Sequence, residues 1–475
     1  MKKKMLALIL ASAMVTGLLA GCGSEEAADT ASNDTATETT AEETAADSTT
    51  EDAPAEETAS SGEKTVVTIF NIHGNPTRDA LVKEIVESQL GDHIEVEFIS
   101  PPGDQAINKR TTMLQSQEDI DIIEGMELYY IENGWLECLD DYVENWDGWD
   151  TMLPNIKEYE YKKGDGHVYG IPYARYERCL FYRKDWLEEA GLEVPGTWQE
   201  LYDAAVALTD PSQNRYGYAM RGANNISWVE MTLNSALGSE YLTPYIGSIT
   251  KELKSIWEYP EAIESAEYWR DLYKYASNPD SISWAYAETV EAFYSGTAGF
   301  LIQDPEVIAT CEEYMEEGTW GTAPLPVDEE SGESWYGGGS GEVWCMTSWC
   351  DNKDAAWEVM AVLNSQEGNM TFSKANGSLP CQSSEGDPFF DEGYYSAYTT
   401  MASDQVKYRT QTDMSGIFAT NEEMEVMNSF TAAEGDVIFQ ELIMEAVSPE
   451  VFCEKLAMQD AWAADSEWLP EKLAE

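Results

Sequence analysis

A segment of forty residues near the N-terminus, 23–62, limits where this chain of 475 residues can fold. The segment contains ten Ala, nine Thr, five Ser and twelve acidic residues, and it has no Leu, Ile, Val, Met or aromatic residue. Such a composition cannot bury enough apolar surface to offset the entropy that is lost on ordering. We therefore expect residues 22–63 to form a disordered acidic tether, and the folded body to begin near residue 64.

Residues 1–21 have the pattern of a cleaved export signal. Three lysines at 2–4 precede an apolar run over 5–20 that is too short to span a bilayer comfortably. The Leu-Ala-Gly-Cys sequence at 19–22 resembles the lipobox of bacterial lipoproteins. This resemblance implies that Cys22 becomes the mature N-terminus and carries a two-chain lipid anchor on the extracellular face of the cytoplasmic membrane. An ordinary secretory signal with a chance cysteine is the alternative.

The charge of the chain excludes several classes of partner. The sequence has 89 acidic and 27 basic residues and a formal net charge of −62. Without three signal lysines and twelve tether acids, the body still carries about −53. Long-range repulsion disfavours nucleic acid and anionic ligands. A solvated, non-adhesive surface explains this acidity better than a role in cation binding.

Cysteine and histidine usage gives no sign of a metal centre. No Cys-x-x-Cys pair occurs, and the three histidines, His73, His93 and His167, are scattered, so we expect no metal and no cofactor. An odd number of cysteines follows Cys22, and we expect most of them to be buried free thiols. Cys345 and Cys350 could form a disulfide if the backbone turns between them. These cysteines are Cys138, Cys179, Cys311, Cys345, Cys350, Cys381 and Cys453.

The start of the body predicts an α/β fold. Short β-rich runs at 65–70, 94–99 and 121–123 alternate with helical patterns. This order predicts a parallel sheet with helices on both faces, in which ligands bind outside the carboxyl ends of the strands. The loops that begin at Asn71 and Glu124 are therefore the expected places for ligand contacts.

Several motifs then follow in a characteristic order. They include YGIPY at 169–173, a segment LFYRKDWLEEAGLEVPGTWQEL at 180–201 in which Thr197 and Glu200 form a helix capping box, and YGYAM at 216–220. Further segments are 292–300, 320–326, 343–346, 354–358 and 377–380. Taken together, residues 64–475 resemble the extracellular solute-binding proteins of carbohydrate ABC importers, family 1, the maltose-binding type.

The resemblance implies a two-lobe periplasmic-binding-protein fold of type II with discontinuous lobes. The chain would cross between lobes near 174–177, 299–303 and 340–343. Lobe 1 would then hold 64–174 and 302–342, and lobe 2 would hold 175–301 and 343–475. Such lobes close on a ligand by hinge bending, and the closed form of a monomer is presented to the permease subunits.

Aromatic residues suit a carbohydrate ligand, because the apolar face of a pyranose stacks on flat rings. The chain has sixteen Trp and twenty-six Tyr, most of which belong to cores. The resemblance favours Trp228, Trp284, Tyr336 and Trp344 as ligand contacts. Trp186, Trp198, Trp269 and Trp357 lie within helical patterns and are expected to be packing residues.

Polar candidates for hydroxyl contacts lie in the same loops and crossings. Each candidate also has a structural alternative: Arg175 could pair with one of the many acidic residues, Asp304 could cap a helix, and Gly338 and Gly339 could form a turn. The complete set is Asn71, His73, Glu124, Arg175, Glu177, Gln303, Asp304, Gly338 and Gly339.

Enzyme signatures are missing from the sequence. It has no Gly-x-Ser-x-Gly elbow, Walker loop, Gly-x-Gly-x-x-Gly or His-Glu-x-x-His motif. The resemblance implies a lipid-anchored protein, not an enzyme, that captures a mono- or oligosaccharide and delivers it to an ABC permease. A glycan-capturing surface lipoprotein and a carbohydrate-active enzyme remain alternatives, as does a binder of peptides or polyamines.

Overall fold

The computed structural model describes residues 64–163, 166–223, 226–244, 246–337, 341–411, 421–427 and 432–473. The expected signal peptide, Cys22, the tether, and the site candidates Gly338 and Gly339 lie outside these residues. Within the described part of the chain, no helix combines the length and the apolar character that crossing a bilayer demands.

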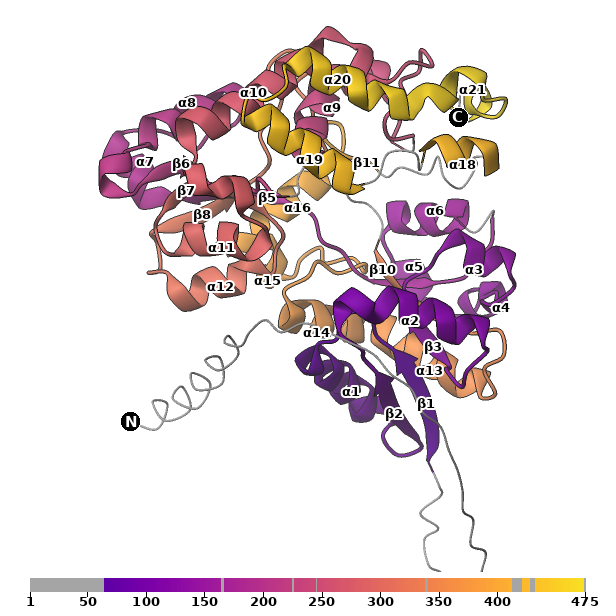
Figure 1. The fold of residues 1–475 in the computed structure, drawn as a ribbon. Helices are drawn as coiled ribbons and strands as arrows, with labels where there is room; N and C mark the ends of the chain where they lie inside the picture. Colours follow the sequence, from indigo (N-terminus) through magenta and orange to yellow (C-terminus); the bar gives the residue numbers. More distant parts are fainter. Residues whose placement is uncertain are drawn as a thin grey trace, which may run out of the picture. The chain divides into compact units, whose positions relative to one another are not determined.

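The first sheet contains strands from both halves of the chain (Figure 1). Its order is β2 (Ile94–Ile99), β1 (Thr65–Phe70), β3 (Ile122–Glu124), β10 (Glu342–Met346) and β4 (Ile171–Ala174). β1 runs parallel to β2 and β3, as the sequence predicts. β10 runs antiparallel to both β3 and β4. The three strands predicted as parallel are parallel, and the late strand β10, which the sequence did not place in this sheet, makes the sheet mixed.

Both faces of this sheet are buried, because side chains alternate along each strand. On β10, Trp344 and Met346 belong to one hydrophobic core, and Val343 and Cys345 belong to another on the opposite face. The first core is covered by α1 (Pro76–Leu90), α13 (Lys353–Asn364) and α14 (Gln366–Asn376), and the second by α2 (Gly103–Gln115) and α3 (Leu128–Glu132).

The second sheet has the order β6 (Tyr216–Tyr218), β7 (Ala298–Gln303), β5 (Cys179–Arg183) and β8 (Trp320–Ala323). β6 is parallel to β7, whereas β5 is antiparallel to β7 and β8. The predicted capping box is present at α8 (Trp198–Leu208), where Thr197 and Glu200 exchange side-chain and backbone hydrogen bonds. The other helices that contribute to this core are α7 (Lys184–Ala190), α9 (Ser227–Tyr241), α10 (Pro260–Ala276), α11 (Tyr286–Tyr294), α12 (Val307–Tyr314), α15 (Pro388–Asp391), α16 (Ser396–Ser403), α19 (Ala432–Ile443) and α20 (Pro449–Ala457).

A separate parallel pair consists of β9 (Ser334–Gly337) and β11 (Tyr408–Gln411), and β9 packs on α9. The remaining α-helices are α4 (Asp140–Val143), α5 (Asp147–Thr151), α6 (Pro154–Lys163), α18 (Asn421–Met427) and α21 (Leu469–Lys472). Short 3-10 turns are η1 (Pro211–Gln213), η2 (Ile256–Glu258), η3 (Pro279–Ser283), η4 (Gly393–Tyr395) and η5 (Met458–Asp465).

The positions at which the chain passes between the two sheets correct the expected boundaries. The first passage, between β4 and β5, is where the sequence places it. The chain does not leave the second sheet at 299–303, because β7 and β8 both belong to that sheet and α12 buries Val307 and Ile308 in its core. Hence most of 302–342 belongs with the second sheet.

Residues after 341 return to the first sheet. β10, α13 and α14 pack there, and Gln382 still forms a bridge with Met152 in the core of the first sheet. We call the part of the chain around the first sheet the first unit, and the part around the second sheet the second unit. From α15 onward, beginning with Phe390, the chain packs in the core of the second sheet. The expectation that all of 343–475 belongs to lobe 2 is therefore wrong for the first forty residues or so.

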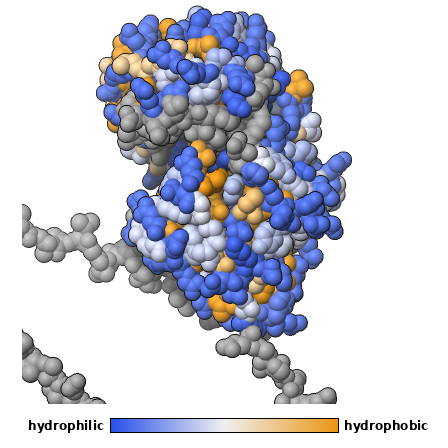
Figure 2. Space-filling model, turned by 90° about the vertical axis from the view of Figure 1, so that its right-hand side faces the viewer, coloured by the Kyte–Doolittle hydropathy of each residue, from blue (hydrophilic) through white to orange (hydrophobic). Residues whose placement is uncertain are grey.

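The cysteines behave as predicted. All seven cysteines of the described residues are free, and six of them are buried. Cys345 and Cys350 form no bridge, and Cys138 is the exposed thiol. The face drawn in Figure 2 is mainly hydrophilic, with small and separate hydrophobic patches, as expected for so acidic a chain.

Candidate functional site

The loop that follows β1 is held in place by Asn71. This side chain is fully buried, and its Nδ2 donates to Asp79 Oδ1 at 2.6 Å, while its Oδ1 accepts the His73 backbone N–H at 2.8 Å. The Asn71 amide is therefore occupied in shaping the loop. Its effect is to fix His73 at the carboxyl end of the strand, where the sequence predicts a ligand contact.

Glu124, the last residue of β3, is the centre of a polar cluster. Its carboxylate accepts the Ile72 backbone N–H at 2.9 Å and the Arg78 Nη2 at 2.7 Å, and it also accepts the Tyr173 hydroxyl. The chain turns directly after it at Gly125, whose φ of +86° is in the left-handed region that favours glycine. Glu124 is fully buried, so these partners offset the cost of burying its charge.

Glu342, the first residue of β10, completes the cluster from a distant part of the sequence. The His73 Nε2 lies 3.0 Å from both Glu124 Oε1 and Glu342 Oε1. Arg78 and Tyr173 donate to Glu342 Oε2 at 2.9 and 2.8 Å. Burial lowers the pKa of His73, but the two carboxylates outweigh it and raise this pKa to about 9, so the imidazole is protonated at neutral pH.

This cluster, which we call the first polar set, consists of His73, Arg78, Glu124, Tyr173 and Glu342. Two cations balance two carboxylates, so the set as a whole is close to neutral. The Arg78 guanidinium already bridges both carboxylates and thereby takes the position that a metal ion would need. The partly exposed side chains of His73 and Glu342 can instead exchange hydrogen bonds with a neutral polar ligand.

A second polar set lies where the strands of the second sheet end. Gln303, the final residue of β7, is buried, and its Oε1 accepts the Asp304 backbone N–H at 3.2 Å. The Arg178 Nε lies 3.7 Å from Asp304 Oδ1. Burial raises the pKa of Asp304, while the cationic Arg178 and Arg221 oppose that shift. Asp304 is thus a partly exposed acceptor with two arginines nearby.

Glu306 extends the second polar set, which therefore comprises Arg178, Arg221, Tyr286, Gln303, Asp304 and Glu306. Burial and the nearby Asp304 raise the pKa of Glu306 to about 7, and the Tyr286 hydroxyl donates to it at 2.9 Å. The negative charge of Glu342 in the first polar set acts in the same direction.

Tyr176 connects the two sets. Burial raises the pKa of its hydroxyl, and both Glu342 and Glu306 add to that rise. The Asn376 Nδ2 donates to the same hydroxyl at 2.8 Å. Next to it, Gly377 lies so close to Glu306 that an added Cβ would be 3.0 Å from the Glu306 Cα. The ends of strands from both sheets therefore meet around the first passage of the chain.

The predicted pair Arg175 and Glu177 forms a structural joint in this passage. Arg175 exchanges two backbone hydrogen bonds of 2.9 Å with Leu379, its Nε donates to the Pro380 carbonyl at 3.0 Å, and its Nη1 pairs with Glu177. Tyr336 also hydrogen-bonds to Glu177. All three predicted side chains are buried, and they line one side of a cavity of about 290 Å³.

The predicted tryptophans differ in what they offer a ligand. Trp344 is 1% exposed and stacks on Tyr173 with a centroid distance of 4.5 Å. Trp228 is 2% exposed, with Trp269 against its ring at 5.9 Å and Arg178 over it at 4.6 Å. Both rings are covered, so in this structure they are packing residues, contrary to the expectation. Trp284 is half-buried and keeps exposed surface.

The expected packing tryptophans are confirmed as such. Trp186, Trp198 and Trp269 are buried in the core of the second sheet, and Trp357 packs against Tyr142 near the first.

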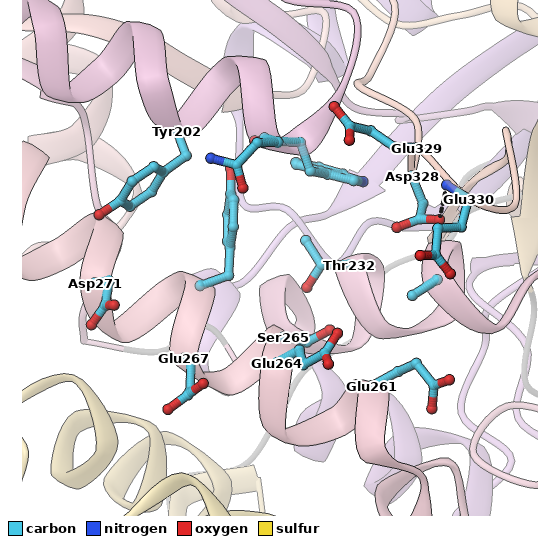
Figure 3. A pocket seen from close by; sticks show the side chains of 14 residues that line it. Tyr202, Thr232, Glu261, Glu264, Ser265, Glu267, Asp271, Asp328, Glu329 and Glu330 are labelled. Carbon is cyan, nitrogen blue, oxygen red and sulfur yellow. Dashed lines mark hydrogen bonds between the residues drawn. The ribbon is translucent and has the colours of Figure 1, made fainter.

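A different pocket, of about 570 Å³, lies between α8, α9, α10 and the loop at 328–330 (Figure 3). None of the predicted site residues lines it. Seven carboxylates and three aromatic rings do, and Figure 3 shows Glu264, Glu267 and Asp271 along one helix. Its walls are helices that cover the second sheet, so it is separate from the strand ends that carry the two polar sets.

Sequence reasoning missed several members of the polar sets. Tyr173 lies in the quoted YGIPY motif, and Glu342 directly follows the glycine-rich turn, so both had a signal. Arg78, Arg178, Arg221, Tyr286 and Glu306 had none beyond their proximity to predicted residues.

Comparisons with known proteins show the family and the fold of the chain. A family model described as a bacterial extracellular solute-binding protein matches residues 73–370. A protein of Brucella abortus (strain 2308), described only as a binding protein, is 24% identical over 407 residues, which cover 81% of this chain and 95% of that protein.

Solved structures resemble the chain over most of its length. An ABC transporter solute-binding protein from Thermotoga lettingae TMO, bound with α-D-tagatose, has a TM-score of 0.62 and 21% identity and covers 84% of this chain and 100% of its own. Maltose-bound MalE3 of T. maritima has a TM-score of 0.65 and 20% identity, with coverage of 82% and 98%. At these identities the similarity shows the fold alone, and it confirms the predicted two-lobe α/β class.

Proposed function

Because the chain belongs to the family of bacterial extracellular solute-binding proteins, we propose that it captures a neutral carbohydrate and delivers it to an ABC importer. The ligand is a sugar or sugar alcohol, held between the two polar sets. Residues from both sheets contribute, so binding favours the state in which the sets are closest.

The observation that carries the proposal is the mixture of donors and acceptors at the strand ends of both sheets. Carboxylates of Glu342, Asp304 and Glu306 accept hydrogen bonds from hydroxyls, and His73 and Arg221 donate them. Charges of both signs are present in each set, which suits a neutral polar ligand better than an ion. Trp284 supplies the half-exposed ring for the apolar face of a sugar.

The membrane anchor is part of the proposal. We propose that Cys22 is acylated and that the acidic segment 22–63 links the body to the membrane, near the permease. A Cys22→Ser variant then leaves the membrane fraction of cells, whereas retention in that fraction would argue against the anchor.

The proposal includes a binding role without catalysis. Within the first polar set, the carboxylates of Glu124 and Glu342 are paired with Arg78 and His73, so this set does not supply the acid and base pair of a glycosidase. Prolonged incubation with a bound oligosaccharide should return it unaltered by chromatography, and any turnover would contradict the receptor role.

The binding test uses calorimetry with neutral monosaccharides, oligosaccharides and sugar alcohols, and with a peptide and a polyamine as competing classes. We expect a carbohydrate to bind and Asp304→Asn to weaken it by about 1.5 to 3 kcal/mol, the range for a hydrogen bond to a charged group. Glu264→Gln, which removes one carboxylate from the pocket of Figure 3, is the matched control and should bind normally. Binding of the peptide or polyamine alone would overturn the proposal.

A further inference from the structure

Three side chains with different donor atoms meet at the edge of the first unit. The Cys138 Sγ, an Asp140 carboxylate oxygen and a His167 ring nitrogen all lie within 4.8 Å of one another. The His167 Nδ1 is 2.7 Å from Asp140 Oδ2, and the Cys138 thiol also hydrogen-bonds to Asp140. Cys138 is the one exposed thiol among the described residues, and the side chains of His167 and Asp140 are 58% and 38% exposed, so an ion can reach all three.

The backbone holds these side chains in register. The Leu139 N–H donates to the Val168 carbonyl at 2.7 Å, and the Val168 N–H donates to Asp140 Oδ1 at 2.8 Å. Leu139 and Val168 are both fully buried in the core of the first sheet. Each donor residue is therefore at, or next to, an anchored position, and the arrangement does not depend on a mobile loop end.

The donor set has the chemistry of a zinc ligand set. Thiolate, imidazole and carboxylate are the three side-chain types that bind Zn²⁺, and three protein ligands leave a fourth position for water. Binding of the ion would release the Cys138 thiol proton to solvent, and the ion would replace the proton between His167 Nδ1 and Asp140 Oδ2. With metal–ligand bonds of about 2.0 Å, that nitrogen and that oxygen need to separate by only about half an ångström. The strongly negative chain raises the local concentration of cations.

We propose that Cys138, Asp140 and His167 form a zinc site with one open coordination position. The second group of metal-ligand type in the described residues, His73 with Glu124 and Glu342, is a weaker candidate, because Arg78 already forms ion pairs with both of its carboxylates. Sequence alone did not suggest the site, since His167 is far from Cys138 along the chain and the contacts of Val168 with Leu139 and Asp140 bring the two segments together. The cluster of Cys138, Asp140 and His167 shares no residue with the two polar sets, so this inference does not depend on the proposed carbohydrate function.

The test is a titration of the metal-free full chain with Co²⁺, read by absorbance. We expect one Co²⁺ per chain, with a thiolate-to-cobalt charge-transfer band in the near ultraviolet that Zn²⁺ abolishes by displacement. Cys138→Ser should remove this band, and His167→Ala should weaken Co²⁺ and Zn²⁺ binding by about tenfold or more. Both positions are exposed, so the apo variants should melt like the wild type.

A matched control is available in the same unit. His93 is also an exposed histidine paired with a carboxylate, its Nε2 lying 2.8 Å from Glu358, but it has no thiol neighbour in the described structure. His93→Ala should leave Co²⁺ binding unchanged. The proposal is overturned if the band survives in Cys138→Ser, or if His93→Ala and His167→Ala weaken binding equally.

Discussion

Among the described residues, Glu160 lies in an environment that is unfavourable for a charged carboxylate. It lies on α6, its side chain is 1% exposed, and neither carboxylate oxygen has a hydrogen-bond partner. Burial raises its pKa from 4.5 to about 7, and the positive charge of Lys163 opposes that rise without cancelling it. A raised pKa means that the folded state favours the neutral acid. The contribution of Glu160 to stability is therefore complete at low pH and is lost as pH rises through about 7.

We expect Glu160→Gln to remove this dependence. Relative to the variant, the wild type should lose about 2 kcal/mol of unfolding free energy between about pH 5 and about pH 8. Urea denaturation at both pH values measures the difference, with Glu264→Gln as the control at an exposed carboxylate. Parallel pH profiles for wild type and Glu160→Gln would contradict the assignment.

Some residues of the candidate site could be predicted from the sequence and others could not. Asn71, His73 and Glu124 were predicted because each follows a strand, and parallel strands bring their ends together. Arg78 and Glu342 were not, because their roles depend on where other segments pack. Nor did the sequence indicate how far each candidate tryptophan is buried: Trp344 stacks in a core, whereas Trp284 keeps exposed surface.

At the scale of elements, β10 is the strand that unites the first sheet. It pairs with β3 on one side and β4 on the other, and its side chains enter the cores of both faces. Trp344 contributes the largest of these side chains and stacks on Tyr173, which in turn donates to Glu124 and Glu342. The packing of Trp344 in the core therefore helps to hold Tyr173 in place within the first polar set.

Trp344→Ala should destabilise the fold by about 3 to 5 kcal/mol, the cost of a large cavity in a buried core. Trp284→Ala, at a half-buried position, is the matched control and should cost clearly less. Urea denaturation followed by circular dichroism compares the two variants. A wild-type midpoint for Trp344→Ala would show that the ring is not a core residue.

The boundaries between units were harder to predict than the elements themselves. The local patterns that specify β1, α1 and β2 lie within a few residues of one another, so those elements were predicted well. The membership of β8 and β10 depends on pairing with β5 and with β3, which are far away in sequence. Local periodicity carries no information about such partners.

At the scale of the molecule, the chain passes between the two sheets three times, and the first polar set is tied to one sheet while the second is tied to the other. Arg175 and Glu177 form the buried joint in the first passage. A ligand that contacts both polar sets shifts the protein toward one conformation only if it binds that conformation more tightly than the other.

Small-angle scattering should therefore show a smaller radius of gyration when the bound carbohydrate is added. The reason is that hydrogen bonds to both polar sets draw the units together. Asp304→Asn at the same ligand concentration is the control, because its weaker binding leaves more of the protein in the ligand-free form. An unchanged curve at saturating ligand would mean that binding requires no closure.

The insertion of β10 between β3 and β4 also affects how the protein is made. The ribosome releases β10 roughly 200 residues after β3, which at ordinary synthesis rates takes about 10 to 40 s. During that interval the facing edges of β3 and β4 have no strand partner, and unpaired edges are templates for aggregation. Until the late strand is available, a chain of this architecture therefore carries two open strand edges that can pair with other chains.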